Sequence, residues 1–311
     1  MTKPSKTVVF FGSGPLAAKS LSLLTQDFEI EAVITKSTPL GHRGEVPVME
    51  LTGKLGIKTY SVETRSQLDD LIETTNFSSQ AAILVDFGII VSQKVIDDFP
   101  RGIINSHFSL LPQWRGADPI SFALLSGQKT TGVSLMLLVE AMDEGPLLGY
   151  SEIVINPDST NPSLSDHLVE LSHNLIKKLV PDYLEGSIEA QPQSITGRDV
   201  SYSRKLTKKD GLLDWTKSAV QLEAEIRAFI EWPKSHTTLG DTVVIITGAH
   251  VVPADNTSPG KLKIENNQLI IGCRENSLSI DKLKPAGKPE MTIQAFLAGY
   301  GNRLSPTLGV N

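Results

Sequence analysis

Short runs of β-branched apolar residues alternate with amphipathic segments along the first part of the chain, and this alternation restricts the fold more than any other feature. Strand-like runs are predicted at residues 7–11, 31–35, 81–85 and 102–106. Apolar residues spaced three and four apart predict helices between them, for example at 15–24 and 66–74. Apolar strands separated by helices are typical of a parallel sheet that is covered on both faces. We therefore expect an α/β, Rossmann-like domain with a mostly parallel sheet.

Two more strand-like runs and one long helix follow. The runs lie at 132–139 and 151–155, and Ser163 is a suitable cap for the helix after them. The apolar periodicity of this helix continues up to Pro181. Because proline has no backbone N–H to donate, we expect the helix to end before it.

The turn after the first strand contains Gly12 and Gly14, followed by Ala17, and matches the spacing of a dinucleotide-binding turn. That site also uses an acidic residue at the end of the second strand, where this chain has Thr35 and Lys36. Pro15 is explained by helix initiation alone. We interpret the turn as structural, without a bound dinucleotide.

The C-terminal part follows a different pattern. Residues 185–200 hold few large apolar side chains and several glycines and prolines, which is typical of a linker. A helix is predicted at 219–229, and short strands separated by turn residues are predicted at 242–247, 261–264, 269–272 and 277–283. Such strands suggest a small OB-like β-barrel. The expected boundaries are a first domain at 1–188, a linker at 189–206 and a second domain at 207–311.

Charge is distributed unevenly between these parts. The 311 residues carry a net charge of −6. Residues 1–200 hold 15 basic and 24 acidic side chains, whereas residues 201–311 hold 14 and 11, a net +3. The acidic average therefore conceals a mildly basic C-terminal third, in which Lys205, Lys208 and Lys209 cluster. A basic surface is what a nucleic-acid partner requires.

Cysteine and histidine usage argues against disulfides and metal sites. Cys273 is the single cysteine, so no intrachain disulfide can form, and the six histidines lack the spacing of a zinc site. The N-terminus lacks the pattern of a signal peptide, and no apolar stretch approaches the roughly 18 residues of a membrane span. We expect a cytoplasmic, monomeric protein without a metal.

The residues with the clearest chemical meaning end the strand at 102–106. Asn105 and His107 are two residues apart, so their side chains project to the same side of a strand. They lie at the carboxyl end of that strand, where open α/β sheets bind ligands. Asp143, in the sequence Asp-Glu-Gly, joins them only if the fold brings the two segments together.

This stretch resembles the formyltransferase family that uses 10-formyltetrahydrofolate. The resemblance rests on Asn105 and His107, the Ser-Leu-Leu-Pro sequence from Ser109 to Pro112, Arg115 with Gly116, and the downstream Asp143. Further likeness extends over most of the chain, and the C-terminal part resembles members that formylate methionyl-tRNA. The matching C-terminal motifs are Tyr202 to Leu206, Leu213 to Trp215, Ile226 to Phe229, Trp232 with Pro233, and Pro285 to Lys288.

The resemblance implies a catalytic role for three residues. Formyl transfer from a folate nitrogen to an amine passes through a tetrahedral intermediate with an oxyanion. Asn105 and His107 would donate hydrogen bonds to that oxygen. His107 would also move protons, because histidine ordinarily titrates near neutral pH, and Asp143 would orient it. The resemblance further places the pterin of the folate near Ser109, Leu110, Leu111 and Pro112, with Phe87 and Ile90 as walls.

The implied acceptor is the α-amino group of initiator methionyl-tRNA. In addition to the three lysines, Arg43, in a glycine-rich basic loop, resembles a tRNA-contacting arginine. This loop is shorter and less basic than in the family, with Glu45 where lysines are common. A sugar-nucleotide N-formyltransferase, or a folate- or RNA-binding module without catalysis, are the alternatives.

Overall fold

The computed structural model describes residues 6–38, 46–253, 258–304 and 307–308. By internal contacts the chain divides into two compact units, which are treated separately here. Unit 1 consists of Met1–Pro119, Thr130–Val154 and Ser165–Ser203. Unit 2 consists of Ile120–Lys129, Ile155–Leu164 and Arg204–Asn311. The contact-based division is therefore not a single cut in the sequence, because two short internal segments group with the C-terminal part.

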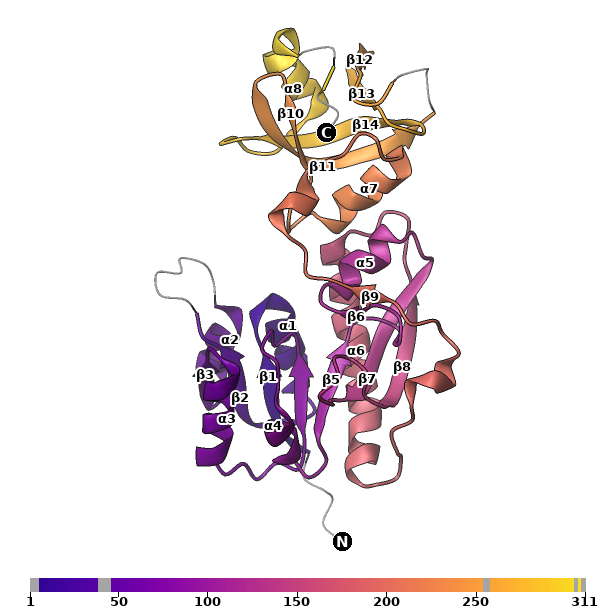
Figure 1. The fold of residues 1–311 in the computed structure, drawn as a ribbon. Coiled ribbons are helices and arrows are strands. Elements are labelled where there is room, and N and C mark those ends of the chain that lie inside the picture. The colour runs from indigo at the N-terminus through magenta and orange to yellow at the C-terminus, as the bar shows by residue number, and fades with distance from the viewer. Residues whose placement is uncertain (1–5, 39–45, 254–257, 305–306, 309–311) are drawn as a thin grey trace. The chain divides into compact units, whose positions relative to one another are not determined.

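Unit 1 is built on a seven-stranded sheet with the order β3-β2-β1-β4-β5-β7-β8 (Figure 1). Its strands are β1 (Thr7–Gly12), β2 (Glu29–Lys36), β3 (Thr59–Val62), β4 (Ala82–Val85), β5 (Ile103–His107), β7 (Thr130–Leu137) and β8 (Leu147–Val154). The first five strands pair in parallel, whereas β7 runs antiparallel to β5 and β8 antiparallel to β7. This confirms the predicted Rossmann-like, mostly parallel sheet.

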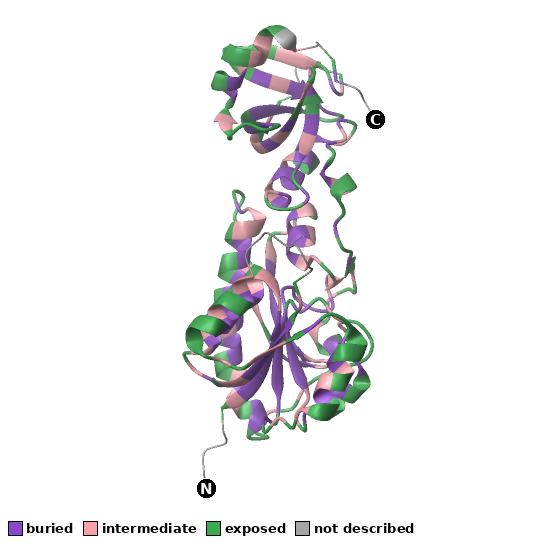
Figure 2. Ribbon diagram, turned by 90° about the vertical axis from the view of Figure 1, so that its left-hand side faces the viewer, coloured by how far each residue is buried: buried purple, intermediate pink, exposed green. Residues whose placement is uncertain are grey.

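Helices cover this sheet, and local sequence explains where they begin. They are α1 (Gly14–Leu24), α2 (Pro47–Leu55), α3 (Arg65–Thr74), α4 (Gln93–Asp97) and α6 (Asn161–Leu184), of which the first turn belongs to unit 2. Thr64 and Ser92 cap α3 and α4 by accepting backbone N–H bonds three residues ahead. Figure 2 shows buried strands between helices whose outer sides are exposed.

The end of α6 differs from the prediction, because the helix continues through Pro181 to Leu184. The last turn is held from outside the helix. The Tyr183 hydroxyl donates to the Arg101 carbonyl at 3.0 Å, and the Arg101 guanidinium donates to the Leu184 carbonyl at 3.1 Å. These tertiary bonds stabilise a turn that proline would disfavour in isolation. The helix also begins earlier than predicted, since the side chains and backbones of Thr160 and Ser163 bond reciprocally around its start.

Unit 2 contains an antiparallel sheet with the order β10-β11-β14-β13-β12, to which β15 adds along β14. Its strands are β10 (His236–Leu239), β11 (Thr242–Val252), β12 (Leu262–Glu265), β13 (Gln268–Gly272), β14 (Ser277–Pro285) and β15 (Met291–Thr292). Irregular pairing on both sides of Gly248 bends β11 against β14. The sheet curls into a half-barrel, which confirms the predicted small OB-like domain (Figure 1).

Helices complete unit 2. They are α5 (Pro119–Leu125), whose first residue lies in unit 1, α7 (Ala219–Ala228) and α8 (Ile293–Tyr300). Ser218 and Gln221 form a capping box at the start of α7. The sequence patterns do not predict α5, α8, β10 or β15, because each is short and lacks a long periodic pattern. Trp215 lies 1% exposed in the core between α7 and the sheet, with Leu222 and Ile246 in the same cluster.

Within the described ranges, every helix is too short or too polar to pass through a bilayer.

Replacing Trp215 by alanine should strongly destabilise unit 2. The substitution removes the largest fully buried side chain and leaves a cavity, so we expect a loss of about 3–5 kcal/mol in the free energy of unfolding. Chemical denaturation followed by circular dichroism measures this loss. Trp232→Ala is the matched control, because Trp232 is 52% exposed, and it should lose about 1 kcal/mol or less. Equal losses would contradict the assigned core.

Candidate active site

Strand β5 carries two polar side chains into the centre of the sheet of unit 1. Asn105 and His107 are only 8% and 7% exposed, and strand alternation places both on one side. Ser106 points to the other side, where its hydroxyl lies 2.6 Å from that of Ser172 on α6. Because β5 pairs in parallel with β4 and antiparallel with β7, its carboxyl end lies where the strand direction reverses. In open α/β sheets, ligands bind outside the carboxyl ends of the parallel strands, and β5 presents His107 at such an end.

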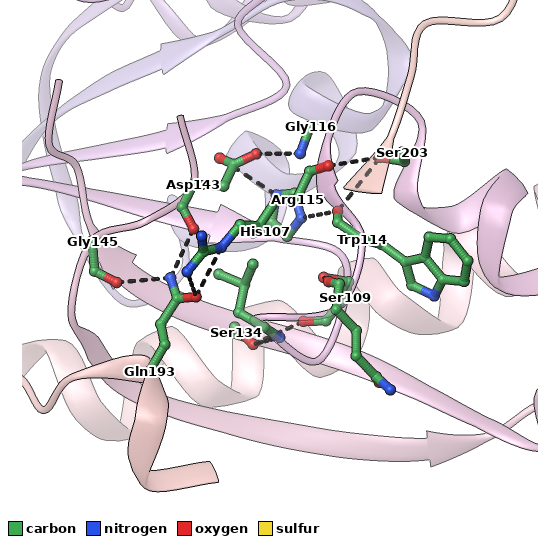
Figure 3. A network of polar contacts seen from close by, with 12 residues as sticks. His107, Ser109, Trp114, Arg115, Gly116, Ser134, Asp143, Gly145, Gln193 and Ser203 are labelled. Carbon is green, nitrogen blue, oxygen red and sulfur yellow. Dashed lines mark hydrogen bonds and ion pairs between the residues drawn. The ribbon is translucent and has the colours of Figure 1, made fainter. Parts of the chain in front are cut away.

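The contacts of His107 determine which ring nitrogen carries hydrogen. Its Nε2 lies 2.9 Å from the carbonyl oxygen of Trp114 (Figure 3). A carbonyl only accepts hydrogen bonds, so Nε2 must be the donor. The other nitrogen, Nδ1, lies 3.8 Å from Oδ1 of Asp143, which is longer than a direct hydrogen bond. The carboxylate therefore acts on the ring through its charge, from the side of Nδ1.

Asp143 is held in place by its loop. Its backbone has a positive φ of 53°, and its Oδ2 accepts a 2.6 Å hydrogen bond from the backbone N–H of Gly116. Gly145 packs directly against β7, since a Cβ there would lie only 1.7 Å from the Leu137 carbonyl oxygen. Glycine at 145 therefore allows the loop to fold back and bring Asp143 to His107. The structure thus brings together the three predicted catalytic residues.

A parallel strand pair fastens the loop after β5 to the segment that follows α6. It joins β6 (Arg115–Gly116) to β9 (Tyr202–Ser203). Gly116 has φ 108°, and a Cβ on it would lie 2.4 Å from the Ser203 carbonyl oxygen. The backbone N–H of Trp114 donates to the Ser201 hydroxyl at 3.0 Å. Part of the predicted linker therefore belongs to this site.

Arg115 lies beside the three predicted catalytic residues. Its guanidinium forms an ion pair with Glu144 at 3.0 Å. It also donates to Oε1 of Gln193 at 2.8 Å and 3.2 Å (Figure 3). The side chain of Arg115 is only 12% exposed. A charge so far removed from water requires such partners.

The residues predicted to contact the pterin lie in two settings. Ser109, Leu110, Leu111 and Pro112 are all buried. The hydroxyl of Ser134 links two of them, because it donates to the Ser109 carbonyl at 2.8 Å and accepts the Leu111 N–H at 2.9 Å. Phe87 is 2% exposed and packs edge-on against Phe11, with ring centroids 5.4 Å apart. Ile90, in contrast, is 65% exposed.

Asp86, at the carboxyl end of β4, lies close enough to Asp118 for the charge of Asp118 to affect its pKa. Asp86 directly follows β4, and its carbonyl accepts the Ser13 N–H at 2.9 Å. Although water reaches Asp86, the surrounding protein desolvates its carboxyl group and raises its pKa to about 6, and the charge of Asp118 adds to the increase. Both residues have positive φ, 47° and 56°. This pair of carboxylates could not be predicted from the sequence, because no local pattern connects positions 86 and 118.

The predicted tRNA-binding lysines lie in unit 2. Lys205, Lys208 and Lys209 are exposed. The neighbouring Arg204 forms an ion pair with Asp210, and this pairing together with hydrogen bonds from Thr207 holds the pKa of Asp210 well below its usual range. Arg43 lies outside the described residues.

Histidines elsewhere have ordinary partners. His173 lies 3.1 Å from Asp27, which Lys177 also contacts at 2.8 Å, and His250 lies 3.0 Å from Asp281. Among the residues with described positions, no three histidine, cysteine or acidic side chains gather closely enough to hold a metal ion.

Comparison with known proteins identifies relatives for the whole chain. The family model described as Formyl transferase matches residues 6–180, and the model described as Formyl transferase, C-terminal domain, matches residues 205–301. The chain is 32% identical to a methionyl-tRNA formyltransferase of Pseudoalteromonas translucida, covering 98% of this chain and 97% of the relative. The one from Methylococcus capsulatus is also 32% identical, over 96% of this chain and 99% of the relative.

Solved structures share the fold at low sequence identity. An N-formyltransferase from Helicobacter canadensis, in complex with folinic acid and dTDP-3-aminofucose, aligns with a TM-score of 0.66 at 17% identity, covering 89% of this chain and 98% of that chain. HypX from Aquifex aeolicus in complex with tetrahydrofolic acid aligns with a TM-score of 0.65 at 14% identity, covering 94% of this chain and 47% of that chain.

Asp86→Asn should stabilise the protein more at neutral than at acidic pH. The folded-state pKa of about 6 exceeds the ordinary value of 3.8, so the folded protein binds more protons between these values and loses stability as pH rises through them. The asparagine variant does not undergo this loss. Its gain in unfolding free energy should therefore be larger at about pH 7.5 than at about pH 4. Since water reaches this residue, the gain will be smaller than the pKa difference alone implies.

Denaturation at the two pH values measures the effect. Asp118→Asn should reproduce part of it, because it removes the like charge beside Asp86. A gain that is the same at both pH values would contradict the raised pKa.

Proposed function

Because the chain belongs to the formyl transferase family, we propose that it transfers the formyl group of 10-formyltetrahydrofolate to the α-amino group of initiator methionyl-tRNA. The observation that carries this proposal is the similarity to methionyl-tRNA formyltransferases over both units of the chain. Asn105 and His107, which are buried, and Asp143, whose side chain is 12% exposed, form a triad of groups suited to the chemistry.

The triad divides the work of acyl transfer. When the amine attacks the formyl carbon, negative charge develops on the formyl oxygen, and the Asn105 amide supplies an N–H donor for it. The amine must lose a proton, and the folate nitrogen must gain one as its bond to carbon breaks. His107 carries that proton, and Asp143 faces the ring nitrogen that receives it, Nδ1, at 3.8 Å.

The hydrogen bond to Trp114 refines the role expected for His107. Since Nε2–H already donates to a carbonyl at 2.9 Å, this N–H is not available to the oxyanion without breaking that bond. We therefore assign oxyanion stabilisation to Asn105 and proton transfer to His107. The same bond fixes the ring orientation, in the way that outer partners orient catalytic histidines.

The folate is proposed to bind beside the triad. The loop from Ser109 to Pro112 begins two residues after His107. Its backbone is fixed by hydrogen bonds with the Ser134 hydroxyl on β7. A rigid backbone can offer N–H and carbonyl groups to a flat heterocycle. Of the two predicted wall residues, Ile90 is exposed and can contact the pterin. Phe87 is buried and packs on Phe11, so it supports the segment after β4 that carries Ile90.

The tRNA is proposed to contact exposed basic residues. Lys205, Lys208 and Lys209 are available to phosphates on the surface of unit 2. Arg43 is proposed as a further contact on the basis of its sequence context.

The unmodified protein should produce N-formylmethionyl-tRNA when supplied with 10-formyltetrahydrofolate. Chromatography of the hydrolysed product identifies formylmethionine, and an aminosugar nucleotide serves as the competing acceptor. Preferential formylation of methionyl-tRNA is expected. Preferential consumption of the sugar nucleotide would replace this proposal with the sugar N-formyltransferase alternative, and formylation of neither would favour a non-catalytic folate- or RNA-binding module.

His107→Ala should lower kcat by roughly 10²–10⁴, because it removes the proton carrier. Asn105→Ala should lower kcat by about 10²–10³, the usual cost of one oxyanion donor. Steady-state kinetics at saturating substrates measures both, with circular dichroism to verify folding. Turnover of His107→Ala close to that of the unmodified protein would remove this residue from the mechanism.

A further inference from the structure

We infer that Gln193, in the part of unit 1 that follows α6, is a positioning residue for formyl transfer that holds the loop of Asp143 against Arg115. The inference rests on the proposed function. Gln193 begins a short 3₁₀ helix (Gln193–Thr196) and is only 6% exposed. The family models match residues 6–180 and 205–301, so this residue lies between the two matched parts of the chain.

The amide of Gln193 makes four hydrogen bonds. Its Nε2 donates to the carbonyl oxygens of Asp143 at 2.7 Å and Gly145 at 2.9 Å. Its Oε1 accepts from Nε and Nη2 of Arg115 at 3.2 Å and 2.8 Å (Figure 3). An amide offers two donor hydrogens and two acceptor lone pairs, so its hydrogen-bonding capacity is fully used.

These partners leave one orientation for the amide. Arg115 can only donate, and the carbonyls of Asp143 and Gly145 can only accept. A flipped amide would place its NH₂ against the guanidinium and its oxygen against two carbonyl oxygens. The site therefore requires a side chain that accepts hydrogen bonds on one edge and donates them on the other. Among the ordinary side chains of this length, glutamine meets this requirement.

The position of these bonds explains their effect on His107. The Gln193 amide donates hydrogen bonds to two backbone carbonyls of the Asp143 loop, and the Gly116 N–H donates to the Asp143 carboxylate at 2.6 Å. These bonds fix both the side chain and the backbone of Asp143, which keeps its positive-φ conformation. Without Gln193, two carbonyls and the Arg115 guanidinium would lose partners in a largely buried place, and the loop would shift to reach water.

Backbone hydrogen bonds two residues before Gln193 anchor its segment to β8. The backbones of Gln191 and Leu147 exchange hydrogen bonds at 2.8 Å and 2.7 Å, which joins the segment to the start of β8. The Gln191 side chain itself is exposed. Gln191 and Gln193 are thus the same residue type in one segment, with one side chain facing water and the other directed into the site.

Two variants separate the donors of Gln193 from its other contacts. Gln193→Glu keeps the length and the acceptor for Arg115, but places a carboxylate oxygen against the two carbonyls. Gln193→Met keeps the length and removes every hydrogen bond. Gln191→Met is the matched control. Circular dichroism and thermal unfolding establish that each protein is folded before its activity is compared.

We expect kcat for formylation of methionyl-tRNA to fall by about 10- to 10²-fold in both Gln193 variants, because small displacements of catalytic groups have effects of this size. KM for each substrate should stay within about threefold, since Gln193 contacts the loop and not the substrate. The pH profile of kcat should also change in Gln193→Met, because the Asp143 carboxylate no longer faces His107 at a fixed distance. A residue with a merely structural role would lower the unfolding temperature and leave the kcat of folded protein and its pH profile unchanged.

The outcomes distinguish this inference from the proposed function. An unmodified protein that makes no N-formylmethionyl-tRNA would overturn the proposed function. An active unmodified protein whose kcat stays within about twofold in folded Gln193→Glu, or falls equally in Gln191→Met, would overturn the positioning role alone.

Discussion

The site depends on the cost of burying ionisable and polar groups in the middle of a sheet. His107 and Asp143 are 7% and 12% exposed at their side chains, so each requires partners other than water. The backbone supplies these partners, through the Trp114 carbonyl for His107 and the Gly116 N–H for Asp143, while the Gln193 side chain binds the backbone carbonyl of Asp143. Three loops are consequently tied to the end of β5. This dependence explains why glycines occur at positions 116 and 145, where the backbones of these loops approach other backbone segments closely.

Much of the fold follows from local patterns that can be read in the sequence. Apolar strands and intervening helices predict the parallel sheet of unit 1, and the two-residue period of a strand places Asn105 beside His107. Short strands with turn residues likewise predict the half-barrel of unit 2. The continuation of α6 past Pro181 could not be predicted, because it depends on bonds to Arg101, some 80 residues earlier. Tertiary contacts of this kind override local propensity.

Within the site, spacing alone does not connect Asp143 to His107, and the resemblance to a family was needed to pair them. Gln193 has no such signal, since it lies in a segment whose composition predicts a linker. Its role depends on three hydrogen-bonding groups that lie far from it in sequence. The acidic pair of Asp86 and Asp118 is of the same kind, because the effect of Asp118 on the pKa of Asp86 arises only when the fold brings two distant segments together. Residues whose role depends on partners far away in the sequence therefore cannot be found from a single sequence.

The pairing of β6 with β9 has a consequence for how the protein is made on the ribosome. Arg115 and Gly116 pair with Tyr202 and Ser203, so groups nearly 90 residues apart must meet. Synthesis proceeds from the N-terminus, and the sheet strands through β8 emerge before the residues that complete the loops around His107. The strands can therefore pair while the loop after β5 still lacks its partner strand, which forms only when Tyr202 and Ser203 have left the ribosome. The loops around His107 can reach their final geometry only after every strand of the seven-stranded sheet has been synthesised.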